Sequence, residues 1–157
     1  QAVSDLDPAG REEYEARGKL YLQQLRVLDA WIREQFNAIP PAARILVTSH
    51  DAFNYFATEY GFRNQAPVGW STGGEVGGGM TPVRRRGVIE SIRGFGVKAI
   101  FVETSVNPKL IREIAAEAGV AVGGALYSDS MGEAGTAGET YIGMMRENVL
   151  TIANALK

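Results

Sequence analysis

The feature that most constrains the fold of this chain is a long amphipathic pattern near its start. Apolar side chains recur at helical spacing over roughly 30 residues, at Tyr14, Tyr21, Leu25, Leu28, Ile32, Phe36 and Ile39. Asp7 followed by Pro8 predicts the start of this helix, and Pro40-Pro41 predicts its end. A helix of this length spans about 45 Å, more than one small domain needs. We therefore expect it to reach beyond its own domain.

After Pro41 the pattern changes to β-rich runs that alternate with helical segments. Four runs are predicted as strands, at 45–48, 66–70, 97–102 and 120–126. The second is the weakest, because Pro67 cannot donate to a ladder. Strands that alternate with helices form parallel sheets. The predicted fold class is α/β, with a four-stranded parallel sheet flanked by helices and preceded by one long helix.

Composition excludes several classes of function. Among the 157 residues the net charge is −2, so the chain has no basic footprint for nucleic acid. No stretch approaches the roughly 18 apolar residues of a membrane span. The chain has no cysteine and a single histidine. A transition-metal site would therefore use His, Asp or Glu and could not be built from a histidine cluster.

Polar side chains follow three of the predicted strands. The first strand is followed by Ser49-His50-Asp51, the third by Glu103-Thr104-Ser105 and the fourth by Tyr127-Ser128-Asp129. Ligands of open parallel sheets bind at the carboxyl ends of the strands, so His50, Glu103 and Asp129 are expected at one edge. Each strand end also has a structural interpretation. Ser49 and Asp51 would cap the following helix, and His50 would be a structural hydrogen-bonding residue. Glu103 would accept hydrogen bonds from loop amides, and Asp129 would hold a turn.

Other functions are consistent with the same residues. One alternative is a small α/β enzyme with His50 as general base and Asp129 as its orienting partner. Another is a non-catalytic interaction domain. The glycine-rich run from Gly73 to Gly79 has neither the lysine of a P-loop nor the spacing of a dinucleotide site, so it is interpreted as a surface loop.

Three ordered runs carry a resemblance to a known family. They are VTSHDAF at 47–53, AIFVETSV at 99–106 and LYSDS at 126–130, joined by Tyr141, Gly143, Met144, Met145 and Asn148 in the last helical segment. Together they resemble the metal-binding solute-binding proteins of ABC importers, the zinc/manganese type that includes some adhesins. This resemblance covers nearly the whole chain.

The resemblance implies two βα lobes joined by one long helix, with the metal held between them by two ligands from each lobe. Residues 1–40 would be the connector helix and residues 41–157 the C-terminal lobe, with the N-terminal lobe absent from this chain. His50 and Asp129 match metal ligands of the family. Glu103, Ser49 and Ser128 would lie near the site, and no catalytic residue is implied.

The resemblance further implies capture of a divalent cation for an ABC permease, by a protein that is periplasmic or extracellular and membrane-anchored. The signal and the anchor would lie outside this chain. The imidazole of His50 favours zinc over manganese or iron, with manganese as the alternative. The implied partners are the permease and the missing N-terminal lobe. Without that lobe the helix exposes apolar surface, so a homodimer or domain swap of the isolated lobe is expected.

Overall fold

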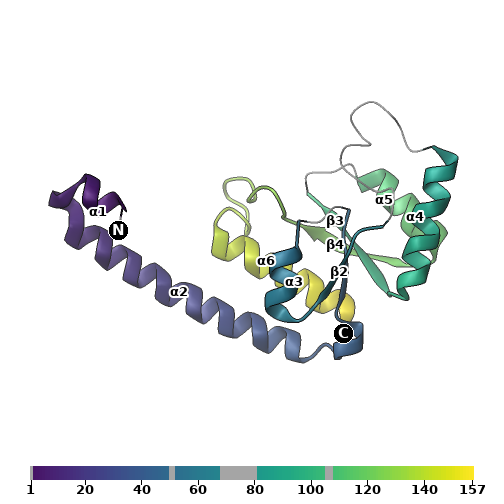
Figure 1. The fold of residues 1–157 in the computed structure, drawn as a ribbon, viewed down its shortest axis with the longest axis horizontal. Coiled ribbons are helices and arrows are strands. Elements are labelled where there is room, and N and C mark those ends of the chain that lie inside the picture. The colour runs from purple at the N-terminus through teal and green to yellow at the C-terminus, as the bar shows by residue number, and fades with distance from the viewer. Residues whose placement is uncertain (1, 50–51, 68–80, 105–107) are drawn as a thin grey trace.

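The computed structural model describes residues 2–49, 52–67, 81–104 and 108–157, arranged as in Figure 1. The helices are α1 (Ala2–Leu6), α2 (Arg11–Asn37), α3 (Asn54–Tyr60), α4 (Pro82–Phe95), α5 (Pro108–Ala118) and α6 (Tyr141–Leu156). The strands are β1 (Ile45–Val47), β2 (Arg63–Gln65), β3 (Ala99–Glu103) and β4 (Ala121–Leu126), and two 3₁₀ turns are η1 (Pro8–Gly10) and η2 (Pro41–Ala43). The predicted loop Gly73–Gly79 lies outside the described residues.

Helix α2 is 27 residues long, which corresponds to about 40 Å. Its second half is buried at Leu28, Ile32 and Phe36, whereas Leu20 and Leu22 in the first half are 59% and 55% exposed. Figure 1 shows its first half, with α1, extending away from the rest of the molecule. The prediction of a long leading helix is therefore confirmed. Within the described ranges, no helix combines the length and the apolar character needed to cross a bilayer.

The start of the long helix differs from the prediction. Pro8 opens the turn η1, and α2 begins only at Arg11. The Asp7 side chain caps no helix among the described residues; instead its Oδ2 accepts a hydrogen bond from the Tyr14 hydroxyl at 2.7 Å. The Tyr14 ring also lies against Gly10, where a Cβ would come within 2.7 Å of it. Contacts of Tyr14 across the turn therefore replace the expected aspartate cap.

The strands pair in parallel, as predicted. Among the described residues they form two two-stranded sheets rather than the single four-stranded sheet that was predicted. β1 pairs with β2 and β3 pairs with β4, and β1 lies beside β3 without a hydrogen-bonded ladder between them. The second described strand occupies 63–65, before the predicted strand at 66–70, of which residues 68–70 lie outside the described residues. Gly61, in the left-handed region at φ 72°, ends α3, and Arg63 N then donates at once to Arg44 O at 2.9 Å. The chain thus enters the strand earlier than its β-rich residues suggested.

Helices cover both faces of the strands. Alternation along β3 sends Phe101 to one side and Ile100 and Val102 to the other. The first side packs against α2, α3 and α6, and the second against α4 and α5. Because both faces are buried, β1 and β3 are apolar at almost every position.

Helix α6 lies unusually close to β4. A Cβ at Gly123 would come within 2.8 Å of the Ala155 Cβ, and one at Gly124, which has φ 141°, within 2.5 Å of Thr151. The two glycines therefore allow the helix to approach the strand backbone. This approach brings the middle of α6 to the carboxyl end of β4.

The second half of α2 is anchored by an aromatic cluster, and replacing Phe36 by alanine should destabilise the protein strongly. The Phe36 ring lies 4.8 Å from that of Phe62, 5.8 Å from Tyr60 and 5.9 Å from Phe56, in edge-on arrangements. We expect Phe36→Ala to lower the free energy of unfolding by about 3–5 kcal/mol, measured by urea denaturation. Leu20→Ala, on the exposed half of the same helix, is the control and should change it by less than about 0.5 kcal/mol.

Candidate metal centre

A buried carboxyl group ties the end of β1 to β3. The Glu103 side chain is 0% exposed at the last position of β3. Its Oε1 accepts hydrogen bonds from Ser49 N at 3.0 Å and from Ser49 Oγ at 2.5 Å. Ser49, two residues past β1, is also buried. The two strand ends are therefore joined by a side chain, where no backbone ladder joins them.

The ends of β3 and β4 meet at the same edge. Glu103 is paired in register with Leu126, and Thr104 N donates to Leu126 O at 2.9 Å. Tyr127 follows directly, and both its N–H and its C=O are hydrogen-bonded to Asn148 of α6. A continuous row of contacts thus runs from β1 through β3 and β4 to α6. The structure brings Ser49, Glu103 and the turn after β4 to one edge, as the order of elements predicted.

The predicted metal ligands are only partly described. Asp129 is exposed in the turn after β4, and next to it Ser128 Oγ is buried with no hydrogen-bond partner among the described residues. His50 lies outside the described residues. Among those that are described, no three His, Cys, Asp or Glu side chains are grouped closely enough to hold a metal ion. A metal site at this edge could use the carboxylate of Asp129. It would need further donor atoms from residues outside the described ranges.

Asn148 belongs to this edge, although in the sequence it stood out only as one of the residues that carry the family resemblance. It is three residues after Met145 and four before Ile152, so it falls on the helix face that is otherwise apolar. A polar side chain on a buried face is normally hydrogen-bonded. Periodicity alone could not identify its partner.

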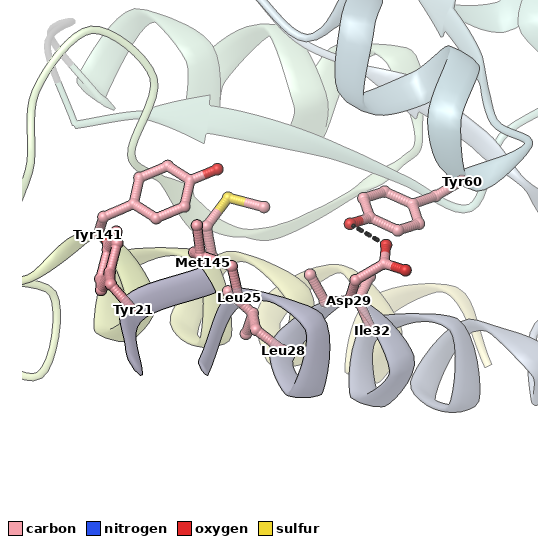
Figure 2. Close-up of a pocket in the computed structure, with 8 residues that line it drawn as sticks. All are labelled: Tyr21, Leu25, Leu28, Asp29, Ile32, Tyr60, Tyr141 and Met145. Atoms are coloured by element: carbon pink, nitrogen blue, oxygen red, sulfur yellow. Dashed lines mark hydrogen bonds between the residues drawn. The ribbon is translucent and has the colours of Figure 1, made fainter. Parts of the chain in front are cut away.

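A separate hollow of about 320 Å³ lies between α2, α3 and α6 (Figure 2). It is lined by Tyr21, Leu25, Leu28, Asp29, Ile32, Tyr60, Tyr141 and Met145. Figure 2 shows Tyr21 and Tyr141 at one end and the Tyr60–Asp29 hydrogen bond at the other. The lining is mostly apolar and includes no residue of the strand edge, so its chemistry does not suit a metal ion.

Polar contacts at one end of this hollow join α2 to α3. Asp29 accepts hydrogen bonds from the Tyr60 hydroxyl at 3.1 Å and from Arg33 Nε at 3.0 Å, and Arg33 also pairs with Glu59. The hydrogen bond from Arg33 lowers the pKa of Asp29. Burial, together with the hydrogen bond to Asp29, raises the pKa of Tyr60 to about 12. These contacts supplement the aromatic anchor of the long helix.

Comparison with known proteins identifies the family. Residues 1–155 match the family described as zinc-uptake complex component A, periplasmic (ZnuA). The chain therefore belongs to the ZnuA family of metal-binding solute-binding proteins. Members of this family are solute-binding proteins rather than enzymes, so the alternative of an enzyme with His50 as general base is not supported.

Relatives named for three different metals match this chain. It is 41% identical over 155 residues to the manganese-binding lipoprotein MntA of Bacillus subtilis (strain 168), covering 96% of this chain and 49% of that protein. It is 37% identical over 161 residues to the zinc-binding protein TroA of Treponema pallidum (strain Nichols), covering 99% and 51%. The iron-binding protein YfeA of Yersinia pestis is 36% identical, covering 98% and 48%. The chain thus spans about half the length of the curated relatives it matches.

Solved structures show the same fold. The periplasmic zinc-binding protein TroA from Treponema pallidum superposes with a TM-score of 0.85 at 35% identity, covering 99% of this chain and 56% of that one. A manganese-bound variant of a periplasmic metal-binding protein from Candidatus Liberibacter asiaticus gives 0.82 at 25% identity, with the same coverage. The α/β fold and the family resemblance predicted from the sequence are confirmed. The assignment of His50 and Asp129 as ligands and the division at residue 40 stay predictions.

The Ser49–Glu103 contact should be energetically coupled. Ser49→Ala removes one hydrogen bond to a buried carboxyl group and should lower the free energy of unfolding by about 1 kcal/mol. Glu103→Leu leaves two buried donors without this acceptor, so the same serine substitution should then cost much less. A double-mutant cycle from urea denaturation should give a coupling of about 1 kcal/mol.

Thr58→Ala is the matched control for this cycle, because its hydroxyl donates to Asn54 O on an exposed helix. Its effect should be equal with and without Glu103. Additive effects of Ser49→Ala and Glu103→Leu would contradict the contact.

The Tyr60 hydroxyl should ionise late in an alkaline titration. An ordinary tyrosine has a pKa of about 10, and that of Tyr60 is raised to about 12. Because the folded state favours the neutral phenol, this group's contribution to stability is present below about pH 10. It is lost as the pH rises through the folded pKa of about 12. Phenolate absorbance should show a late component near pH 12 that Tyr60→Phe reduces. Tyr55→Phe, whose ring is 95% exposed, should leave that component in place.

Proposed function

We propose that this chain is part of an extracytoplasmic solute-binding protein that captures a divalent transition metal for an ABC importer. The observation that carries the proposal is a similarity that covers 96% or more of this chain but only about half of relatives named for binding manganese, zinc or iron. In this proposal the chain supplies half of the metal site, through His50 and Asp129. The other half comes from an N-terminal lobe.

The chemistry of the two proposed ligands favours zinc. A neutral imidazole from His50 suits zinc better than manganese, whereas a carboxylate such as that of Asp129 serves either metal. Four nitrogen and oxygen ligands that leave no open position suit storage and transfer of an ion rather than catalysis. Relatives with similar identity are named for different metals, so manganese is the alternative cargo.

The buried row at the strand edge would support these ligands. Ser49 precedes His50, and its N–H and hydroxyl are both held by Glu103. Residues that hold a ligand-bearing segment in place commonly matter for metal affinity almost as much as the ligands. Glu103, Ser49 and Ser128 are therefore assigned roles in support of the site and no direct bond to the metal.

The exposed half of α2 suits contact with the remainder of the protein. Leu20 and Leu22 are both exposed there, and α1 and the first half of α2 extend away from the strands (Figure 1). An N-terminal lobe would bury these side chains, as the hydrophobic effect favours. A homodimer or domain swap of this chain would bury the same surface. An ABC permease is the proposed receiver of the metal.

The proposed location is outside the cytoplasm. The family description contains the word periplasmic, and relatives such as MntA of Bacillus subtilis are named lipoproteins. A membrane-anchored protein in the periplasm or at the cell surface would present the bound ion to its permease.

Zinc should stabilise the protein against thermal unfolding in a way that depends on both ligands. An ion that binds only the folded state adds about 2.7 kcal/mol at about a hundredfold excess over Kd. Thermal melts of the whole gene product that contains these residues should show a rise in Tm when zinc is added. His50→Ala and Asp129→Ala should each abolish this rise. Glu133→Ala removes a nearby exposed carboxylate and is the control, which should keep the rise.

A rise that survives in both ligand variants would contradict the assignment of His50 and Asp129. The same titration with manganese compares the two metals, and a larger rise in stability with manganese would contradict the preference for zinc.

Sedimentation of the 157-residue chain alone measures whether it self-associates. A monomer at every concentration would contradict the expected dimer.

A further inference from the structure

A buried asparagine holds the main chain at the end of β4. The Asn148 side chain is 2% exposed. Tyr127 N donates to Asn148 Oδ1 at 2.8 Å, and Asn148 Nδ2 donates to Tyr127 O at 2.8 Å. One side-chain amide therefore pairs with both backbone polar groups of a single residue. Two opposed hydrogen bonds of this kind restrict both the position and the rotation of that peptide segment.

Tyr127 needs such a partner because the ladder stops one residue earlier. Leu126 O is the acceptor for Thr104 N, which lies one residue beyond the end of β3. Tyr127 is the first residue past β4, and its backbone groups bond to a helix side chain. Asn148 thus extends the ordered backbone by one residue, toward the turn that contains Asp129.

The ring of Tyr127 is held by a second, independent contact. Gly138 is buried, and a Cβ there would come within 2.7 Å of the tyrosine ring. The segment around it is closed by a hydrogen bond from Gly132 N to Gly138 O at 2.8 Å. Tyr127 is therefore fixed through its backbone by α6 and through its ring by the loop, two residues before Asp129.

We propose that Asn148 is a positioning residue for the metal-binding carboxylate of Asp129, an inference that rests on the proposed function. Metal–oxygen bonds to zinc are about 2.0–2.2 Å long, so a small displacement of the turn removes the carboxylate from the ion. Without the two hydrogen bonds, the turn samples other positions. Apparent affinity falls in proportion to the fraction of molecules with the competent geometry.

The test compares two neighbouring substitutions on α6. Asn148→Leu keeps the approximate size of the side chain and removes both hydrogen bonds. Val149→Ala, at a position that is 0% exposed in the core, destabilises the helix but leaves Asn148 in place. Zinc affinity is measured by competition with a chelator on the whole gene product, at a temperature where circular dichroism shows every variant folded.

Asn148→Leu should weaken zinc binding about tenfold, as expected if about a tenth of molecules keep the competent turn. Val149→Ala should stay within about twofold, whatever its loss of stability. Equal affinities for Asn148→Leu and the unmutated protein would overturn the proposal. If Asn148→Leu does not fold, Asn148→Asp replaces it, because aspartate keeps the acceptor and loses the donor, and the same weakening is expected.

Amide hydrogen exchange of the unmutated protein provides a readout without any metal or variant. The Tyr127 amide should be protected, and rapid exchange there would overturn the proposal. The zinc measurements distinguish the positioning role of Asn148 from the role of Asp129 as a ligand. Zinc binding that needs Asp129 but not Asn148 overturns positioning alone, whereas zinc binding that does not need Asp129 overturns the assigned ligand and positioning with it.

Discussion

A buried carboxyl group at the end of β3 holds the strand edge together. Burying such a group is costly unless hydrogen bonds replace those it made with water. Glu103 recovers two of them from Ser49, at a point where β1 and β3 share no backbone ladder. The same contact therefore offsets part of the cost of this burial and joins the two strand pairs. Among the described residues proposed for the site, Ser49 and Glu103 form this contact, and Ser128 and Asp129 follow the strand that pairs with β3.

The long helix divides into two halves with different roles. Its second half belongs to the core, where Phe36 contacts three aromatic rings and Ile32 is fully buried. Asp29 and Arg33 add polar contacts to α3. The first half carries the apolar side chains of Leu20 and Leu22, which stay 59% and 55% exposed. A helix that is packed into the core along one half and exposed along the other could hold a second domain in a fixed orientation.

The family fold does not by itself select a metal. Relatives with 36–41% identity are named for manganese, zinc and iron. Selectivity among these ions depends on the ligand atoms and on their geometry. In the proposed site, His50 and Asp129 would supply the ligand atoms that come from this chain. In the same proposal, the Glu103 and Asn148 contacts would hold the ligand-bearing segments in place. The affinity for the metal and the choice of metal would then depend on different residues of this edge.

The sequence by itself determined the local elements and their order. Periodicity identified the long helix and the buried strands β1, β3 and β4, because these signals repeat within a few residues. Ser49 and Glu103 were expected at the strand edge because each lies at the end of a β-rich run. The tertiary structure decided which residues pair across long distances in the chain, because local sequence patterns do not encode those partners. Glu103 bonds across 54 residues and Asn148 across 21, and Tyr14 displaces an expected cap. Hydrogen-bond partners distant in the chain leave no periodic trace, so only the folded chain reveals which side chains hold the site.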